Sequence, residues 1–370
     1  MEESRNDLNI LIAVGGTCGH LLPARALASA LVQKHPDISI TFIGAGLKRN
    51  TYFKKDRFPF LDIESGTPFK KDPIHILKVL LKISKGLKRS LKFIKEKKPD
   101  LIVGFGSYHT FPAIYAAKLK KIPIIIFESN ALPGRVNRFC SKWAKISAIQ
   151  FLHARDYLKS DCVCVQMPLL KKKGDLSQKE ARAYFGLEEK RLTFLIFGGS
   201  QGAQSIDHFI CGALEPLNSK GIQFQVVHIV GDAKRIEKLQ EIYKKYQIPS
   251  SVKVFEEKME YAWVAADLSI SRAGSGTLAE LIEFSIPSIL IPYPLATENH
   301  QSTNAAFVTE EIKGAVTLEE EGLRGFILAD TISQLLANDQ EALKKMKRAL
   351  KNFKKEESKQ DLCSLVLKTL

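Results

Sequence analysis

The stretch LNILIAVGGTCGH (8–20) decides the fold of this chain. The run LNILIAV has the length and apolar character of a strand that is buried on both faces of a parallel sheet. A glycine turn follows it, and the next residues, LLPARALASALVQKH (21–35), have helical spacing. The same order of strand, glycine turn and helix recurs from LTFLIFGGSQGA (192–203) onward. We therefore expect two domains that share one architecture.

The rest of the chain supports this division. With 370 residues, of which 45% are hydrophobic, it can form two cores. A charged stretch without periodicity, QMPLLKKKGDLSQ (166–178), marks the boundary. We expect Rossmann-like domains at 1–165 and 166–338, and a lysine-rich helical segment at 339–370 that packs back on the first domain. Strand-like runs alternate with helical segments, which is typical of doubly wound parallel α/β sheets; they lie at 38–44, 100–106, 122–130, 224–231, 251–257, 267–274 and 286–294.

Charge and cysteine content narrow the class of protein. The net charge of +15 favours anionic partners, which include nucleic acid, phosphorylated ligands and anionic membranes. The six cysteines form no CxxC pair and no metal-binding spacing, which favours a reducing cytoplasm. No apolar run approaches the roughly 20 residues that span a bilayer, and the polar start MEESRNDLN is not a signal peptide. We expect a soluble or peripheral protein.

The two glycine turns suggest a phosphate site. A turn between strand and helix aims the free N–H groups of the helix at a ligand, and this arrangement suits phosphate. Ligands of open α/β sheets bind at the carboxyl ends of the strands, so two facing domains leave a cleft between those ends. Neither turn matches GxGxxG or the P-loop pattern, which disfavours a nicotinamide enzyme or a kinase. The alternative is that the glycines only permit a tight turn.

Several polar side chains lie near these turns. His20 begins a helix, where positive charge is disfavoured, so a neutral imidazole could act as a base or simply bind nearby backbone. Glu280 follows SRAGSGTLA (271–279) in the first turn of a helix. It could bind ribose hydroxyls or only stabilise the helix N-terminus. Gln301 and Asn304 could face the cleft or cap a helix.

The helix expected at 75–95 carries two stripes. Such a helix can lie on an anionic bilayer. The interpretation we favour is a crossover helix whose apolar stripe packs on the sheet; its positive charge still makes this region the first candidate for membrane attraction. The apolar stripe contains Ile76, Leu80, Ile83, Leu87, Leu91 and Ile94, and the basic stripe contains Lys78, Lys82, Lys85, Arg89 and Lys92.

Taken together, six stretches between residues 14 and 306 resemble the MurG family, in family order: VGGTCGH, GFGSY, FESNALPGRVNR, FGGSQGA, SRAGSGTLAEL and ENHQSTNA. These are peripheral glycosyltransferases of peptidoglycan synthesis. The resemblance implies the GT-B fold, with UDP-N-acetylglucosamine in the second domain and a lipid-linked undecaprenyl-pyrophosphoryl acceptor in the first. It implies an anionic membrane surface on the cytoplasmic face of the inner membrane, and other cell-wall or division proteins as partners. We expect no metal or other cofactor, since a helix end can stabilise the leaving diphosphate.

The resemblance also implies roles for individual residues. It makes His20 the candidate base, which Glu128 would assist, for removing the proton from the MurNAc 4-hydroxyl of lipid I. That oxygen would displace UDP with inversion and give lipid II. Residues implied to bind the donor are Thr17, Cys18 and Gly19 in the first turn; Asn130 and Gln301 at the sugar; Ser200, Gln201 and Gly202 at the diphosphate; Glu256 at the uracil; and Glu280 at the ribose, with Ser275, Gly276, Thr277, Leu278 and Ala279 beside it.

Some positions depart from the family pattern, and other functions remain as alternatives. Related transferases that glycosylate diacylglycerol share much of the pattern. A basic nucleic-acid-binding protein is a further alternative, but no RNA motif or zinc-finger spacing supports it, so we expect no nucleic acid partner. The departures are Cys18 for a glycine, Ser107 and His109 in a loop that is usually richer in glycine, Phe127 for a histidine, Leu170 for an arginine, and Glu256 for an apolar residue.

Overall fold

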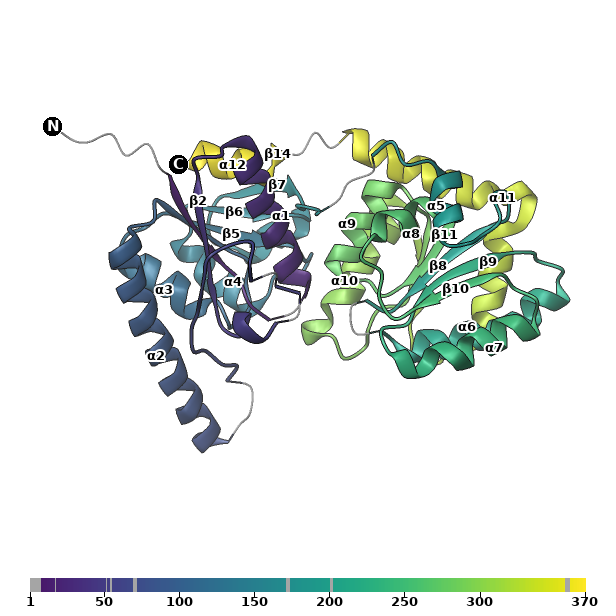
Figure 1. Cartoon of the computed structure of the whole chain (residues 1–370), viewed down its shortest axis with the longest axis horizontal. Helices are drawn as coiled ribbons and strands as arrows, with labels where there is room; N and C mark the ends of the chain where they lie inside the picture. Colours follow the sequence, from purple (N-terminus) through teal and green to yellow (C-terminus); the bar gives the residue numbers. More distant parts are fainter. Residues whose placement is uncertain are drawn as a thin grey trace. The chain divides into compact units, whose positions relative to one another are not determined.

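The computed structural model describes residues 8–16, 18–50, 52–53, 55–68, 72–170, 174–199, 202–356 and 360–370, without the side chains of Cys18 and Glu356. The described residues form two compact units (Figure 1). Unit 1 lies within Met1–Leu170 and Lys359–Leu370, and unit 2 lies within Lys171–Ser358. The expectation of two doubly wound α/β domains is confirmed by the sheet of each unit.

Unit 1 contains a parallel sheet in the order β14-β7-β6-β5-β4-β1-β2-β3. Its strands are β1 (Asn9–Ala13), β2 (Ser39–Gly44), β3 (Phe60–Asp62), β4 (Leu101–Gly104), β5 (Ile124–Glu128), β6 (Ile146–Ile149), β7 (Cys162–Gln166) and β14 (Gln360–Asp361). Its α-helices are α1 (Cys18–Lys34), α2 (Pro73–Lys97), α3 (Phe111–Leu119), α4 (Arg135–Cys140) and α12 (Leu362–Thr369). Helices α2, α3 and α4 cover one face, where Leu11, Ile102 and Ile126 form the core with them.

Unit 2 contains a parallel sheet in the order β10-β9-β8-β11-β12-β13. Its strands are β8 (Thr193–Phe197), β9 (Gln225–Ile229), β10 (Ser250–Lys253), β11 (Leu268–Ser271), β12 (Ser288–Leu290) and β13 (Ala315–Thr317). Its α-helices are α5 (Gln178–Tyr184), α6 (Gln204–Ser219), α7 (Ile236–Lys245), α8 (Met259–Ala265), α9 (Ser275–Phe284), α10 (His300–Ala306) and α11 (Gly325–Glu356). Phe194 and Ile196 pack against α6, α7 and α11, while Phe197 contacts Trp263 of α8.

The C-terminal segment returns to unit 1. Gln360 of β14 pairs with Val165 of β7, and Lys34 of α1 lies 3.3 Å from the carboxylate of Asp361. Helix α11 instead belongs to unit 2, packs against α6 and is interrupted by non-helical backbone at 337–340. The segment that joins unit 1 therefore begins near Gln360 rather than at residue 339.

Helix α2 packs over only part of its length. Asp72 caps it by accepting hydrogen bonds from the backbone N–H groups of Ile74 and His75, and Pro73 occupies the first helical position. The fully buried positions are Val79, Gly86, Ser90 and Ile94, and Leu87 and Leu91 of the predicted stripe pack partly buried against the core. Leu80, which the prediction buried, is 56% exposed. The N-terminal half of α2 extends away from the sheet in Figure 1.

We expect Gly44→Ala to destabilise the protein by about 3 kcal/mol. A Cβ at this last residue of β2 would lie 1.7 Å from the backbone oxygen of Val14, so the first turn would have to move. Urea unfolding of unit 1 measures the effect. Gly174→Ala is the control, because no atom of the described residues lies within 4 Å of a Cβ there, and its free energy of unfolding should change by no more than about 0.5 kcal/mol. Equal stabilities of the two variants would contradict the prediction.

Candidate active site

Each sheet has a strand at which the order of its neighbours reverses. In unit 1 this strand is β1, between β2 and β4, and in unit 2 it is β8, between β9 and β11. Ligands of open α/β sheets bind beyond the carboxyl ends of the strands at such a switch point. The two glycine turns follow β1 and β8, so each unit presents its turn at the position where a ligand is expected.

The first turn packs tightly against the loop that follows β4. A Cβ at Gly15 would lie 2.6 Å from Cβ of His109. Gly16 has φ of 87°, and a Cβ there would lie 3.3 Å from Oγ of Ser107. A larger residue at either glycine would therefore push the two loops apart.

Ser107 and His109 form a side-chain pair below this turn. Oγ of Ser107 lies 2.8 Å from Nδ1 of His109, and Ser107 adopts φ of 74°, which non-glycine residues rarely do. Burial lowers the pKa of His109 below its usual value, although the charge of Asp62 opposes this shift. The sequence indicated these residues only as departures from a glycine-rich loop, and the structure brings them against the first turn.

Glu128 is the last residue of β5, and its carboxylate accepts hydrogen bonds from the loop that follows. Its side chain is buried, with 3% exposure. Oε1 accepts hydrogen bonds from the backbone N–H and the Nδ2 of Asn130, at 2.9 and 3.1 Å. Oε2 accepts from the backbone N–H of Gly134 at 3.0 Å and from Nδ2 of Asn137 at 2.8 Å. These four bonds fix the position of Asn130.

The environment of Glu128 favours a structural task. Burial raises its pKa, and the hydrogen bonds from Asn130, Asn137 and Gly134 oppose that shift. Because N–H donors occupy both oxygens, the carboxylate acts as an acceptor for the loop, and its assistance in proton removal stays a prediction. Asn137, which also donates to the backbone oxygen of Phe127, was missed as a contributor although it lies within FESNALPGRVNR.

His20 and Gly19 lie in the first turn of α1. The imidazole of His20 is half-buried and starts the helix that the first glycine turn introduces, as the sequence predicted. Thr17 lies outside the described residues, as does the side chain of Cys18. Their predicted contacts with a donor therefore stay predictions.

The second turn brings backbone against backbone. A Cβ at Gly198 would lie 2.1 Å from the backbone nitrogen of Ala203, and one at Gly202 would lie 2.0 Å from the oxygen of Val230. Ala203 is the N-cap of α6 and has no side-chain oxygen to cap it, so the first N–H groups of α6 are suited to an anion. Ser200 and Gln201 lie outside the described residues.

A buried polar network supports this turn. Asp207, in the first turn of α6, binds the guanidinium of Arg235. Its Oδ1 accepts a 3.2 Å hydrogen bond from Nε2 of His228. Nδ1 of His228 lies 2.9 Å from the hydroxyl of Tyr243. Arg235 lies against Gly202 and offsets the charge of Asp207, which would otherwise weaken anion binding at the helix N-terminus. The sequence does not reveal this network, because its members are far apart in the chain.

Glu280 lies in the second turn of α9, because this helix begins at Ser275, so the predicted position in the first turn is wrong. Ser275 to Ala279 precede it in the same helix. Its Oε2 accepts a 2.8 Å hydrogen bond from the indole N–H of the buried Trp263. Burial raises the pKa of Glu280 to about 7, the bond from Trp263 lowers it, and the charge of Glu260 raises it. The buried carboxyl is therefore protonated more readily than an exposed glutamate, and one of its oxygens accepts a hydrogen bond from Trp263.

Gln301 joins two loops of unit 2. Its Oε1 accepts hydrogen bonds from the backbone N–H groups of Ala273, at 3.2 Å, and Tyr293, at 3.0 Å. Asn304, in the same helix α10, donates to the backbone oxygen of Ala273. The oxygen of Gln301 is thus used by the protein, and its amide N–H groups are what it can offer to a sugar.

Glu256 is held rigidly in the loop after β10. Lys253 Nζ lies 2.7 Å from its carboxylate, the backbone N–H of Lys258 donates at 2.8 Å, and the hydroxyl of Tyr184 donates at 3.2 Å. Burial alone would raise its pKa, but these bonds, led by that from Lys253, outweigh burial and lower it. A charged and fixed side chain leaves the backbone of this loop as the part that can contact a base.

Leu170, in place of the family arginine, is 42% exposed at the end of unit 1. Within the described ranges, no three His, Cys, Asp or Glu side chains form a group that could hold a metal ion. In that same part of the chain, no helix is both long and apolar enough to cross a membrane.

Comparison with known families identifies both halves of the chain. Residues 10–149 match the glycosyltransferase family 28 N-terminal domain. Residues 193–362 match the glycosyltransferase family 28 C-terminal domain. The two matches cover the glycine turns and the loops described above.

Two curated proteins illustrate the similarity, and both are named UDP-N-acetylglucosamine--N-acetylmuramyl-(pentapeptide) pyrophosphoryl-undecaprenol N-acetylglucosamine transferase. The protein of Protochlamydia amoebophila is 39% identical, and the alignment covers 97% of this chain and 95% of that one. The protein of Bacillus subtilis is 33% identical, with 94% of this chain and 95% of its own covered.

Solved structures confirm the GT-B fold. The crystal structure of Acinetobacter baumannii MurG matches with a TM-score of 0.76 at 24% identity, covering 98% of both chains. A UDP-glucosyltransferase from Polygonum tinctorium matches with a TM-score of 0.70 at 15% identity, covering 96% of this chain and 95% of that one. At these identities the likeness concerns the fold.

We expect Glu280→Gln to stabilise the protein at high pH. The folded state holds the pKa of this carboxyl near 7, above its unfolded value, so folding favours the protonated form. The contribution of protonated Glu280 to the free energy of unfolding is complete below the pKa of the unfolded state, and it is lost as the pH rises through about 7. The free energy of unfolding of the variant should exceed that of the wild type by about 2 kcal/mol at pH 8 and by much less at pH 5. Urea unfolding at both pH values measures this difference. An equal difference at both pH values would contradict the shifted pKa.

Proposed function

The chain belongs to glycosyltransferase family 28, in its MurG group, and on this premise we propose that it transfers N-acetylglucosamine from UDP-N-acetylglucosamine to lipid I. Lipid I is the undecaprenyl-pyrophosphoryl-MurNAc-pentapeptide, and its MurNAc 4-hydroxyl is the acceptor. The product, lipid II, supplies peptidoglycan synthesis. The observation that carries the proposal is the 39% identity to a curated transferase of this name, which extends over 97% of the chain.

Unit 2 binds UDP-N-acetylglucosamine in this proposal. The diphosphate lies at the N-terminus of α6, where backbone N–H groups and the helix dipole favour negative charge. Glycine at 199 and 202, with φ of 84° and 69°, lets the turn approach the phosphates closely. Ser200 and Gln201 of the same turn complete the diphosphate site.

The nucleoside and the sugar use the neighbouring loops. Glu280 accepts hydrogen bonds from the ribose hydroxyls, and Ser275 to Ala279 line that part of the site. The loop at Glu256 contacts the uracil through its backbone. The amide N–H groups of Gln301 are suited to a sugar hydroxyl, because its oxygen is used by Ala273 and Tyr293. Asn130, Thr17, Cys18 and Gly19 are further residues proposed to contact the donor.

The reaction is a direct displacement with inversion. His20 removes the proton from the acceptor hydroxyl, whose oxygen attacks the anomeric carbon while the bond to UDP breaks. The negative charge that develops on the leaving diphosphate is stabilised by the N–H groups of α6. Glu128 assists by holding the loop that carries Asn130, since its own oxygens are occupied by four N–H donors.

An exposed apolar surface on unit 1 supports attachment to a membrane. Ile74, Leu77, Leu80 and Leu81 of α2 are each between 55% and 64% exposed. Exposed lysines accompany them on the same helix, at 78, 82 and 85. Leucines beside lysines are the composition of a helix that lies on an anionic bilayer.

Unit 1 also contains an aromatic cluster with one exposed ring, to which α3 contributes two side chains. The rings of Phe111, Tyr115, Phe139 and Trp143 form a cluster with neighbouring centroids 5.1 to 6.1 Å apart. Nζ of Lys142 lies 3.9 Å from the centroid of Phe139, which is 49% exposed. Amphipathic aromatic groups next to lysines suit the interface between lipid and water. We place the protein on the cytoplasmic face of the inner membrane, where it would meet cell-wall and division proteins.

A transfer assay tests the function directly. Purified protein is incubated with labelled UDP-N-acetylglucosamine and either a soluble lipid I analogue or diacylglycerol. Transfer of label to the lipid I analogue with release of UDP is expected. Transfer to diacylglycerol alone would show that the acceptor is diacylglycerol and not lipid I. The absence of donor binding would overturn the whole proposal.

We expect His20→Ala to reduce kcat by about 10²- to 10⁴-fold, because the acceptor hydroxyl loses its base. Donor affinity, measured by titration calorimetry, should change little. His35→Ala is the matched control and should keep its kcat, because this exposed histidine lies directly after the C-terminal end of α1. Near-normal kcat in His20→Ala would show that another group is the base.

We expect replacement of Leu77 and Leu81 by serine to weaken binding to anionic vesicles by about tenfold, since two exposed leucines would no longer enter the interface. Cosedimentation with phosphatidylglycerol vesicles measures this. Phe326→Ser is the control, because this residue is 58% exposed but lies in unit 2. Equal loss in both proteins would rule out a specific role for α2.

A further inference from the structure

Arg272 is a buried arginine at the carboxyl end of β11. Only 7% of the residue is exposed. Its NH1 donates to the backbone oxygens of Ile291 and Pro292, both at 3.1 Å, and pairs with the carboxylate of Glu320. Its NH2 donates to Oγ of Ser205 at 2.9 Å. The donors on both arms of the guanidinium are therefore used by the protein.

The partners of Arg272 come from separate loops of the donor unit. Ser205 lies in the first turn of α6, directly after the second glycine turn. Ile291 and Pro292 follow β12, and Glu320 follows β13. Strands β11, β12 and β13 are neighbours in the sheet, and α6 follows β8 on the other side of β11. One guanidinium thus connects the ends of four successive strand–loop units.

The same loops are braced by further contacts around Arg272. Its guanidinium carbon lies 5.3 Å from the ring centroid of Tyr293. Gln301 accepts hydrogen bonds from the backbone N–H groups of Tyr293 and Ala273. Ala273 follows Arg272 in the chain, and Tyr293 follows Pro292, whose oxygen accepts from Arg272. A shift of Arg272 would therefore move Gln301, the proposed sugar contact, as well as the start of α6.

We propose that Arg272 is a positioning residue for the donor site, which aligns the diphosphate helix α6 with the loops that carry Gln301 and Glu280. The proposal rests on the donor site assigned above to unit 2. Arginine is required because its planar fork directs donors to several acceptors at once, whereas lysine is a point charge. Glu320 balances the buried charge. Arg272 acts through Ser205 and Tyr293 and does not itself contact the substrate.

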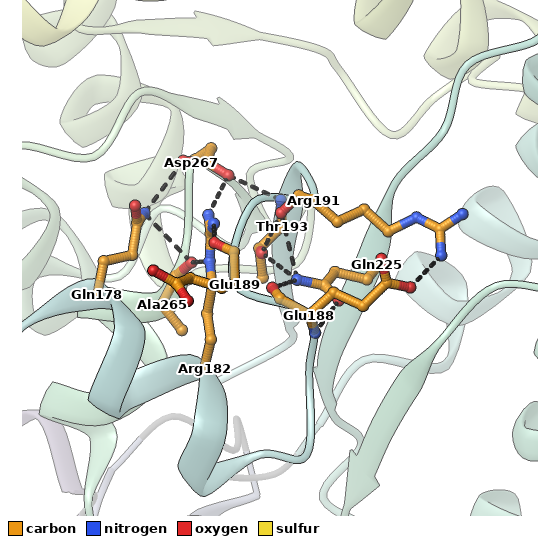
Figure 2. A network of polar contacts seen from close by, with 9 residues as sticks. All are labelled: Gln178, Arg182, Glu188, Glu189, Arg191, Thr193, Gln225, Ala265 and Asp267. Carbon is orange, nitrogen blue, oxygen red and sulfur yellow. Dashed lines mark hydrogen bonds and ion pairs between the residues drawn. The ribbon is translucent and has the colours of Figure 1, made fainter.

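Unit 2 contains a second buried arginine, Arg182, at the amino ends of its strands, opposite to the carboxyl ends where Arg272 lies. Arg182 pairs with Asp267 at 2.6 Å and donates to the backbone oxygens of Ala265 and Glu189, as Figure 2 shows. Asp267 also accepts from the backbone N–H of Thr193, the first residue of β8. This network joins the amino ends of β8 and β11, away from the glycine turn. The side chain of Arg182 is 5% exposed and that of Arg272 is 8% exposed, so the two arginines are equally buried.

The test compares Arg272→Lys with Arg182→Lys. Both variants lose a buried guanidinium, and both should show a lowered Tm. Arg272→Lys should also raise the donor KM by about tenfold or more and leave the acceptor KM unchanged, since bonds to a charged group are lost where the donor binds. Arg182→Lys should keep its donor KM within about twofold of the wild type. UDP binding by calorimetry should follow the donor KM.

A milder variant keeps the proposal testable if Arg272→Lys does not fold. Ser205→Ala removes only the bond between Arg272 and α6, and it should raise the donor KM by about fivefold with little change in Tm. An unchanged donor KM in Ser205→Ala and, where it folds, in Arg272→Lys would make Arg272 a purely structural residue and overturn the proposal. If the wild-type protein itself binds no UDP-N-acetylglucosamine, the assigned donor site fails instead.

Discussion

Close packing of backbone against backbone at the carboxyl edges of the two sheets is the constraint on which the rest of the structure depends. At Gly44 and at Gly202, a Cβ would fall on a neighbouring carbonyl oxygen. These contacts bring the strand–helix turns down onto the adjacent strands, so that the helix N-termini point at the place where a phosphate is proposed to bind. Side chains could not fill these positions without separating the loops that form the site.

In each unit one buried ionisable side chain binds the loops at the carboxyl ends of the strands. This side chain is acidic in unit 1 and basic in unit 2. In unit 1 the carboxylate of Glu128 accepts N–H groups from the loop after β5. In unit 2 the guanidinium of Arg272 donates to carbonyl, carboxylate and hydroxyl oxygens from several loops. A buried charge is costly unless its partners surround it, and the loop groups that satisfy it are thereby fixed. The loops can therefore be irregular in conformation and still hold side chains in place.

The long apolar runs were sufficient to predict most of the parallel strands. Strands β6 and β7 were missed because ISAI and CVCVQ are short and have no distinctive flanking turn. Strand β14 contains only Gln360 and Asp361, and it exists because β7 offers a free edge to pair with. The burial of Gly86 beside the apolar stripe of α2 could not be predicted, because it depends on a contact between the helix and the backbone of Glu64 that the missing Cβ allows.

The sequence by itself determined the two doubly wound domains, their glycine turns and the family, because strand length, turn composition and helical spacing are local properties of the chain. It also indicated His20, Glu280 and Gln301 as site residues. Only the tertiary structure decided that His109 packs below the first turn, that Glu128 is occupied by its own loop, and that Arg272 connects four loops. Such contacts join residues far apart in sequence, and their partners are determined only when neighbouring strands bring their ends to one edge of the sheet.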